Sequence, residues 1–318
     1  MKILSVISSM DPVKGGLSQS IRNLVPALAE RGAQSEVLSF DAPDAAFLGK
    51  DDFPIHAIGP GKGPYAYCAA LRPWLEENIA RFDAVIAQGL WLHNNAGTWR
   101  TVQRLRQAHP EAGPRFYVMP HGMLDPYFQN APERRWKAMR NVVVWKLFEG
   151  SAVNGADGVL FTCAQEMILA RQPFSPYHPK RELDVGLGIQ APPPLTGSMA
   201  PAFAARCPEL GDKPYLLFLG RVHEKKGTDL LLRAYLDLRR ERADMPALVI
   251  AGPGLESEHG RGLLALADGH PDVYFPGMLS GDEKWGALYG CDAFVLPSHQ
   301  ENFGIAVVEA MACGKPVM

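Results

Sequence analysis

Short apolar segments alternate with longer amphipathic segments along the whole chain, and this alternation limits the possible folds more than any other feature of the sequence. The apolar segments are residues 3–8, 36–40, 84–87, 116–119, 158–162, 215–219, 247–251, 273–275 and 293–296. Strands this apolar need helices over both faces, which is typical of a parallel sheet. The repeated order of strand and helix therefore predicts an α/β fold with doubly wound sheets.

A chain of 318 residues is too long for one ordinary core, so we expect two domains. Prolines punctuate residues 173–214, where the periodicity is weak and a connection between domains is expected. The predicted organisation is a first domain over residues 1–190, a Pro-rich linker over 191–212 and a second domain over 213–318. The last five residues, 314–318, read as a helix end leading into a new strand. The second domain is therefore expected to be incomplete, with the natural protein continuing.

Composition excludes several classes of protein. The formal net charge is −2, so no overall field draws the chain to nucleic acid. Five scattered cysteines without a C-x-x-C pair argue against a disulfide framework or structural zinc and favour reduced, cytoplasmic thiols. No stretch reaches the roughly 20 apolar residues that span a bilayer. We expect a cytoplasmic protein that lies, at most, peripherally on a membrane.

The strongest motif lies in residues 301–317, after the last predicted strand. Glu301 falls in a loop, Gly304 permits close approach of the backbone, and a helix is expected to begin near Phe303 and to carry Glu309. The free N–H groups and positive dipole end of such a helix suit a phosphate. The two carboxylates can instead accept hydrogen bonds from the hydroxyl groups of a sugar and a ribose. Alternatively they form a solvated face or a capping pair, but an unpartnered Glu309 would be unusual on so apolar a helix.

A second motif follows the strand at residues 215–219. Arg221 lies in the loop after that strand, and Lys225, Lys226 and Gly227 precede a helix predicted over residues 228–240. Cations are unfavourable at a helix start unless an anion is bound there, and arginine can grip phosphate oxygens in a fork. The pattern predicts an anion clamp, with ordinary surface charge as the alternative.

The spacing of Glu301 and Glu309, with Phe-Gly and Glu-Ala-Met-Ala between and around them, resembles the E-x7-E signature of the retaining glycosyltransferases of family 4, also called group 1. The resemblance implies a GT-B fold: two Rossmann-like, doubly wound parallel-sheet domains that face a central cleft, with the acceptor on the N-terminal side and the nucleotide-sugar on the C-terminal side. It implies that Glu301 contacts hydroxyls of the donor sugar and Glu309 the ribose. Asn302, Phe303 and Gly304 belong to the same substrate-binding loop. Relative to that family, the chain is expected to be C-terminally truncated.

The resemblance extends to the second motif, where Arg221 and Lys226 match the diphosphate ligands of a G-R-x(n)-K-G segment, whereas Lys225 is read as their solvated neighbour. It also gives weight to Gly15 and Gly16, which follow the first strand and precede a helix expected over residues 19–31. Adjacent glycines let a backbone donate N–H groups to a ligand, although a plain turn is an equal reading of the pair alone. In the family, the matching loop closes over the diphosphate.

Three further polar residues follow apolar strands. His121, after the strand at residues 116–119, is suited to enter an active cleft, and the resemblance places it near the reacting sugar. His93 is a candidate on the acceptor side, or else structural. Glu166 resembles the family's strand-end T/S-x-x-E and is interpreted first as a helix cap and second as lining the cleft.

The segment from Glu133 to Phe148 is basic and amphipathic. Such a segment can rest on anionic lipid and reach a lipid-linked acceptor. It is more often a core helix with a solvated basic rim.

These observations together predict a metal-independent hexosyltransferase. It would move a hexose from a UDP- or GDP-sugar to a saccharide or lipid-linked saccharide, with retained anomeric configuration, in cell-surface polysaccharide synthesis. His121, Arg221, Lys226 and Glu301 are the predicted catalytic residues, and Gly15, Gly16, His93 and the 302–304 loop with Glu309 bind substrate. No strand-terminal Asp-x-Asp occurs, so neither a metal nor another cofactor is expected. Direct front-face transfer is the favoured mechanism.

Three alternatives remain open at this stage. A sugar-nucleotide epimerase of the same architecture would bind the diphosphate without an acceptor. A non-catalytic nucleotide-sugar-binding protein would bind the donor without turnover. A nicotinamide-dependent oxidoreductase is disfavoured, because no G-x-G-x-x-G follows the first strand.

Overall fold

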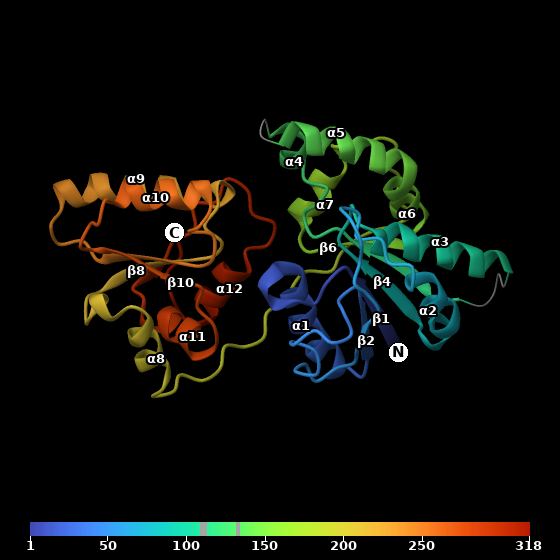
Figure 1. The fold of residues 1–318 in the computed structure, drawn as a ribbon, viewed down its shortest axis with the longest axis horizontal. Coiled ribbons are helices and arrows are strands. Elements are labelled where there is room, and N and C mark those ends of the chain that lie inside the picture. The colour runs from blue at the N-terminus through green and yellow to red at the C-terminus, as the bar shows by residue number, and fades with distance from the viewer. Residues whose placement is uncertain (109–112, 132–133) are drawn as a thin grey trace. The chain divides into compact units, whose positions relative to one another are not determined.

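The computed structural model describes residues 1–108, 113–131 and 134–318. The chain divides into two compact units, Met1–Gly188 and Ile189–Met318. Each unit is built on its own parallel sheet flanked by helices (Figure 1). The predicted fold class, two doubly wound α/β domains, is confirmed.

The first unit contains a seven-stranded sheet in the order β3-β2-β1-β4-β5-β6-β7, with every neighbouring pair parallel. Its strands are β1 (Lys2–Ile7), β2 (Gln34–Ser39), β3 (Ile55–Ala57), β4 (Ala84–Gln88), β5 (Arg115–Met119), β6 (Gly158–Phe161) and β7 (Glu182–Asp184). Its helices are α1 (Gly16–Ala29), α2 (Leu71–Asn78), α3 (His93–Ala108), α4 (Tyr127–Asn130), α5 (Arg135–Val144), α6 (Gly150–Gly155) and α7 (Ala164–Ala170). Short 3-10 turns occupy Pro12–Lys14 and Ile79–Arg81, and a π-helical turn, η4, occupies Trp145–Glu149.

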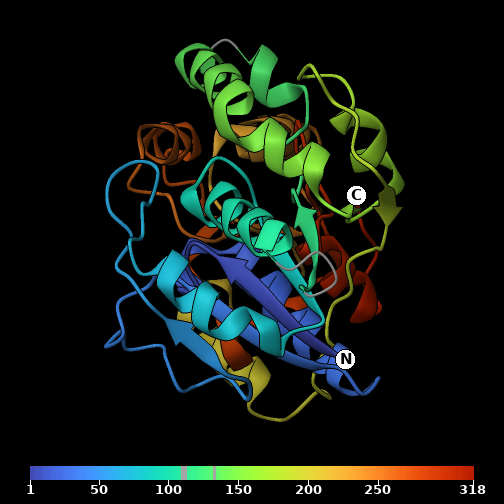
Figure 2. The same cartoon turned by 90° about the vertical axis from the view of Figure 1, so that its right-hand side faces the viewer.

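Alternating side chains along the central strands enter different cores. Leu4 and Val6 of β1 join the cluster that contains α2 and α3, whereas Ile7 packs with Ile21 and other residues of α1. Figure 2 shows α2 and α3, cyan and teal, side by side on one face of this sheet. Each strand is apolar on both faces because helices cover both faces, as the unbroken apolar runs predict.

The second unit contains a four-stranded parallel sheet in the order β10-β9-β8-β11. The strands are β8 (Tyr215–Leu219), β9 (Ala247–Ala251), β10 (Val273–Gly277) and β11 (Ala293–Phe294). The helices are α8 (Met199–Arg206), α9 (Thr228–Glu241), α10 (Glu258–Ala267), α11 (Gly281–Gly290) and α12 (Ile305–Ala312), with 3-10 turns at Pro208–Leu210 and Glu224–Lys226. Figure 1 shows α9 and α10 on one face and α8 and α11 on the other. The core divides accordingly, since Phe218 packs with α9 and α10 while Leu217 packs with α8 and α11.

Part of the segment predicted as a Pro-rich linker, residues 191–212, is helical. Helix α8 reads Met-Ala-Pro-Ala-Phe-Ala-Ala-Arg, and it buries Met199 and Phe203. A Cβ atom on Gly286 of α11 would lie 2.1 Å from the carbonyl oxygen of Met199, so only glycine permits this close approach of the two helices. The proline count concealed this element, because a proline within the first turn of a helix is tolerated.

Two strands have no counterpart among the predicted apolar runs. β3 and β7 contain three residues each and lie at opposite edges of the first sheet. Their sequences, Ile-His-Ala and Glu-Leu-Asp, carry polar residues because edge strands are only partly covered. At the other end of the chain, Val317 pairs in parallel with Phe294 of β11, which agrees with the expected strand after residue 314.

A carboxylic acid is buried in the first unit where η4 packs against α3. Glu149 is fully buried and its Oε2 accepts a hydrogen bond from Asn95 Nδ2. Burial raises the pKa of Glu149 to about 8. Within the described residues, Glu149 Oε1 and Asn95 Oδ1 have no hydrogen-bond partner. A protonated carboxyl group is a donor as well as an acceptor, so the neutral acid is the form that suits this pair.

We predict that the first unit loses stability as the pH rises from about 4.5 to 8, because Glu149 is ionised in the unfolded chain but holds its proton in the folded one. Its folded pKa lies above the unfolded value, so the folded state holds the extra proton between about pH 4.5 and 8 and stability falls as pH rises through that window. Glu149→Gln replaces the acid by an amide that cannot ionise, so it should reduce the dependence of stability on pH. Thermal unfolding between pH 5 and 9 measures the effect. Glu76→Gln, at an exposed position of α2, is the control. Equal pH slopes for Glu149→Gln and wild type would contradict this interpretation.

Candidate functional site

The two motifs of the second unit meet where the order of its strands reverses. β8 is followed along the sheet by β9 on one side and by β11 on the other, so the loops after β8 and β11 diverge from neighbouring positions. The carboxyl edge at such a reversal is where open α/β sheets bind ligands. His299 N donates to the carbonyl oxygen of Lys225 at 2.9 Å, which joins the two loops.

Gly227 makes this junction possible. Its φ is 63°, and a Cβ atom there would lie 2.1 Å from the carbonyl oxygen of Pro297. Both the left-handed backbone and the close approach require glycine. Gly227 also precedes α9, which extends over Thr228–Glu241 close to the predicted range.

Lys226 and Glu301 form an ion pair between these loops, through Lys226 Nζ and Glu301 Oε2. Their side chains are 23% and 30% exposed, so both can also reach solvent or a ligand. The residues are 75 positions apart in the sequence. The residue predicted to bind phosphate and the residue predicted to bind the sugar are thus in direct contact.

Arg221 lies on the same edge, between two fixed residues. Gly220 N donates to the carbonyl oxygen of Ala251 at 3.0 Å, and Val222 N donates to that of Pro253 at 2.9 Å. These bonds fix the backbone on both sides of Arg221, whose side chain is exposed. The arrangement leaves a guanidinium group on a rigid support at the end of β8.

Helix α12 begins at Ile305, two residues after the predicted start near Phe303. Gly304 precedes it in a left-handed conformation with φ 72°, which displaces the helical start beyond Asn302 and Phe303. Those two residues therefore belong to the loop, with Asn302 and Phe303 partly exposed and Gly304 buried. The first N–H groups of α12 remain at the carboxyl edge of the sheet, where they suit an anion.

Glu309 has a partner that the sequence did not reveal. The residue is 8% exposed, and its Oε1 lies 2.9 Å from Nζ of Lys284 on α11. Lys284 Nζ also lies 4.0 Å from the centroid of the Trp285 ring. The buried carboxylate is therefore charge-compensated in this structure, and Lys284 would share it with any ribose hydroxyl.

The first unit has a corresponding reversal between β1 and β4. The loop after β1 leads to Gly15, whose φ is 81°, and α1 begins at Gly16, three residues before the predicted start. Asp41 holds this loop, since its carboxylate accepts from Ser9 Oγ at 2.5 Å and from Met10 N at 2.7 Å. Asp41 thus supports the loop after β1, and it belongs to none of the sequence motifs.

His121 lies at the end of β5 in the same unit. Its Nε2 is 2.7 Å from Oε1 of Gln88, the last residue of β4, and Gln88 Nε2 donates to Ser5 Oγ on β1 at 3.3 Å. Desolvation lowers the pKa of His121 to about 4, so its imidazole is neutral near pH 7. Its φ of 54° is left-handed, and such a conformation costs a non-glycine residue about 1–3 kcal/mol. Strain of this kind concentrates at functional positions.

His93 has structural contacts that account for its position. Its Nδ1 accepts from Cys68 N at 3.1 Å, and its ring lies 4.7 Å from the Tyr67 ring. A Cβ atom on Gly97 would lie 2.9 Å from His93 Nε2. The imidazole therefore anchors the loop before α2 and packs over α3, which supports the structural alternative for this residue.

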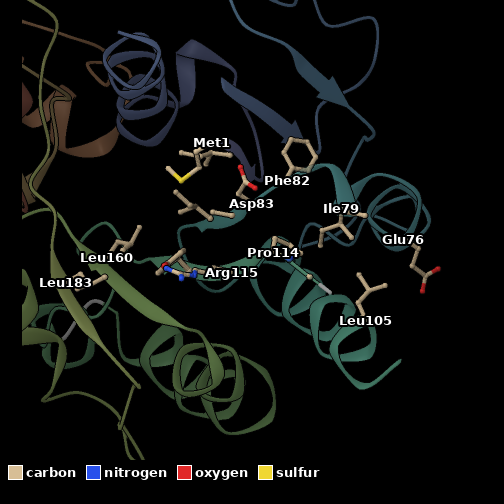
Figure 3. Close-up of a pocket in the computed structure, with 16 residues that line it drawn as sticks. Met1, Glu76, Ile79, Phe82, Asp83, Leu105, Pro114, Arg115, Leu160 and Leu183 are labelled. Carbon is tan, nitrogen blue, oxygen red and sulfur yellow. The ribbon is translucent and has the colours of Figure 1, made fainter. Parts of the chain in front are cut away.

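A cavity of about 980 Å³ lies away from all of these residues. Mostly apolar side chains at the amino ends of β1, β4 and β5 line it, including Met1, Phe82 and Pro114, together with charged Asp83 and Arg115 (Figure 3). The motif residues of this unit follow the carboxyl ends of the same strands. Since ligands of doubly wound sheets bind at the carboxyl edge, we do not assign the reaction to this cavity. In the described ranges, no three His, Cys, Asp or Glu side chains gather as a metal site.

We predict that Gly227→Ala unfolds the loop junction of the second unit. Left-handed strain together with the clash against Pro297 should cost about 2–5 kcal/mol of unfolding free energy. Gly32→Ala is the control, because Gly32, shortly after α1, has φ 78° and open space around its Cβ position, so backbone strain of about 1–2 kcal/mol applies without a clash. Urea unfolding measures both variants. Equal losses would show that the approach of Pro297 is not restrictive.

Comparison with known proteins identifies the family. Residues 15–182 match the glycosyl transferase 4-like domain, and residues 203–318 match the glycosyl transferases group 1. A D-inositol 3-phosphate glycosyltransferase of Segniliparus rotundus is 27% identical over 96% of this chain and 69% of its own length. Another, of Salinispora tropica, is 37% identical over 39% of this chain and 28% of its own length.

Solved structures agree at the level of the fold. Anabaena Alr3699/HepE in complex with UDP and glucose has a TM-score of 0.68 and 19% identity, covering 100% of this chain and 80% of that one. Sucrose-phosphate synthase from Thermosynechococcus elongatus has a TM-score of 0.66 and 19% identity, covering 99% and 80%. The chain spans 69% of the length of the Segniliparus protein and 80% of the Anabaena chain. It spans only 28 to 31% of the length of the Salinispora protein and of two other relatives that match over shorter regions. The glycosyl transferase 4-like domain alone covers more than half of the chain, and the group 1 domain follows it. The chain therefore belongs to the group 1, or family 4, glycosyltransferases.

Proposed function

We propose that this protein is a retaining, metal-independent glycosyltransferase that moves a hexose from a UDP- or GDP-sugar to a saccharide or lipid-linked saccharide. The contact between Lys226 and Glu301 is the observation that carries the proposal. It joins a cation suited to a diphosphate and a carboxylate suited to sugar hydroxyls beside the start of α12. UDP and glucose in the Anabaena structure support the choice of donor class.

The proposed reaction breaks the bond between the anomeric carbon and the β-phosphate oxygen. The acceptor hydroxyl oxygen forms the new bond to that carbon on the same face, and its proton passes to the departing phosphate oxygen. The nucleoside diphosphate gains negative charge as it leaves. Arg221, Lys226, the amides of Gly15 and Gly16 and the first turn of α12 are the proposed stabilising donors. A single preorganised donor of this kind contributes about 2.7–4 kcal/mol.

Donor binding requires Lys226 to exchange partners. In the structure, its ammonium group is paired with Glu301. A diphosphate carries more charge than a carboxylate and competes for the ammonium, which frees Glu301 to accept hydrogen bonds from the sugar. Glu309, which also contacts Lys284, is the proposed ribose ligand, and we propose that His121 acts on the reacting sugar.

We propose a cytoplasmic location, with the activity in cell-surface polysaccharide synthesis. No disulfide joins the five cysteines, all of which lie in the described residues, and this fits a reducing compartment. A lipid-linked acceptor would also require contact with the inner face of the membrane, and α5 offers a surface for it. Trp136, Met139, Val143 and Leu147 form a stripe of exposed apolar side chains, 83%, 57%, 55% and 61% exposed.

The charge around this stripe fits anionic lipid. Arg135, Lys137, Arg140 and Lys146 are exposed along the same helix and η4. Glu133, the first residue of the predicted amphipathic segment, lies outside the described residues. In the described ranges no helix has the length and apolar content to cross a bilayer. Peripheral binding through an apolar stripe with a basic rim is the proposed mode.

We predict that Arg221→Ala and Lys226→Ala each lower kcat/KM for UDP-glucose or a GDP-hexose by about 100- to 1,000-fold, as expected for loss of one oxyanion donor. Release of the nucleoside diphosphate by the protein measures the rate. Arg240→Ala is the control, because Arg240 is exposed on α9 and pairs only with exposed Asp237. Unchanged kcat/KM in both clamp variants would remove the clamp from the proposal.

The same assay separates the alternative functions. An epimerase converts its nucleotide-sugar without an acceptor and without releasing the diphosphate. A binding protein raises its melting temperature with the donor, in proportion to affinity, but gives no turnover. Diphosphate release that increases with an added saccharide acceptor is the result expected for the transferase.

We predict that flotation with liposomes depends on both anionic lipid and the stripe on α5. Vesicles of phosphatidylcholine with phosphatidylglycerol should carry the protein upward, whereas pure phosphatidylcholine should not. Trp136→Ser with Leu147→Ser should abolish flotation, whereas Leu238→Ser on α9, also an exposed apolar residue, should leave it unchanged. Failure of the wild type to float at low salt would exclude the proposed membrane contact.

A further inference from the structure

Two hydrogen-bond systems converge on His121, one on its ring and one on its backbone. The ring contacts Gln88 as described above, through Nε2 and Oε1 at 2.7 Å. The backbone is held by Glu166 of α7, whose Oε1 accepts from Gly122 N at 2.5 Å. Gln88 belongs to no motif from which a function was inferred, whereas Glu166 lies in a motif that was interpreted first as a helix cap and second as lining the cleft.

Glu166 joins the loops after β5 and β6. Besides Gly122, it accepts from Thr162 N at 2.8 Å and from Thr162 Oγ1 at 2.6 Å, both through Oε2. The carboxylate is 5% exposed, so its charge depends on these three donors. His121 and Gly122 have φ values of 54° and 77°, and this left-handed pair persists only because its surroundings fix it. The Glu166 carboxylate bonds directly to this pair through Gly122 N, while Asp125 N donates to the carbonyl oxygen of Gly122 at 3.1 Å.

Gln88 determines which imidazole nitrogen remains for a ligand. Its Nε2 donates to Ser5 Oγ, so its Oε1 faces His121 and accepts a hydrogen from Nε2. The neutral ring then carries its proton on Nε2 and a lone pair on Nδ1. Among the described residues, Nδ1 has no protein partner in a hydrogen bond. A lone pair on a neutral, partly exposed imidazole suits the hydroxyl group of a sugar.

We propose that Gln88 and Glu166 are positioning residues for the transferase site, with Gln88 fixing the Nε2–H tautomer of His121 and Glu166 fixing its left-handed backbone. The proposal rests on the function proposed above for His121. Gln88 and Glu166 do not touch the substrate in this account. They act through the orientation of His121 Nδ1, which accepts a hydrogen bond from a hydroxyl of the donor sugar.

The charged and titratable groups near this imidazole are few. Glu166 approaches from α7 through Gly122, while Gln88 and Ser5 approach from β4 and β1 as neutral groups. No cation or carboxylate is in hydrogen-bond contact with the ring within the described chain. A carboxylate introduced at position 88 would therefore be the only charge in contact with the ring. It should favour the protonated imidazole.

The first experiment follows the imidazole by nitrogen-15 NMR of labelled full chain, assigned with His121→Asn. The wild-type spectrum should show the Nε2–H tautomer and no protonation above pH 5. In Gln88→Glu the midpoint should move to higher pH, and in Gln88→Met the tautomers should mix. An Nδ1–H tautomer in the wild type, or a midpoint that Gln88→Glu leaves in place, would overturn the role of Gln88. This readout does not require turnover, so it stays valid if the proposed transferase activity is absent.

The second experiment separates positioning from binding. With UDP-glucose as the probe, Gln88→Met should lower kcat for UDP release by up to about 100-fold while KM changes little, because the imidazole is misplaced but the diphosphate clamp is intact. Glu166→Gln has one acceptor oxygen for three donors and should act likewise, whereas Glu166→Asp should recover part of the loss. Circular dichroism checks folding of each variant. Wild-type kcat in folded Gln88→Met and Glu166→Gln would refute the proposal, whereas no UDP release by the wild type would refute the proposed function instead.

Discussion

The reversal of strand order within each parallel sheet is the constraint on which the rest of the molecule depends. β8 and β11 are neighbours, but their connections lead to opposite sides, so the loops after them diverge at the carboxyl edge, where open α/β sheets bind ligands. Lys226 and Glu301, 75 residues apart, meet there. In the first unit, Gln88 and His121 meet at the carboxyl ends of β4 and β5, beside the reversal between β1 and β4. The position of the polar groups is thus a consequence of sheet topology, and the apolar strands supply that topology.

Sequence patterns located the parts of the fold that bury both faces of a strand. The apolar runs at β4, β5, β8 and β9 coincide with strands, because a strand between two helical layers has no polar side chain to interrupt the run. The edge strands β3 and β7 escaped this criterion because one side of each is only partly covered. Helix α8 escaped it for another reason, since its proline lies where a helix tolerates one and its packing depends on a glycine in α11.

The candidate site was predictable to the extent that its residues follow one another along the chain. Arg221, Lys226, Glu301 and Glu309 were found because each lies at a fixed distance from a strand end or a helix start. The contact of Lys284 with Glu309 and that of Gln88 with His121 were not predicted, because Lys284 and Gln88 come from other elements and reach these residues only through three-dimensional packing. A polar residue at the end of an otherwise apolar strand, as Gln88 is in β4, was the one sequence signal for such a contact. It indicates that a polar side chain is needed at the carboxyl edge.

The two lysine–glutamate pairs differ in how readily a donor can displace them. Glu301 is 30% exposed in its pair with Lys226, and a partly solvated ion pair of this kind contributes only about 0–1 kcal/mol. Glu309 is 11% exposed in its pair with Lys284, so separating that pair would strand a poorly hydrated carboxylate. A diphosphate can therefore take Lys226 from Glu301 at small cost, whereas Lys284 should stay on Glu309. If Lys226 binds the diphosphate as proposed, the loop after β11 adjusts on donor binding, while α12 and α11 keep the relation that they have in this structure.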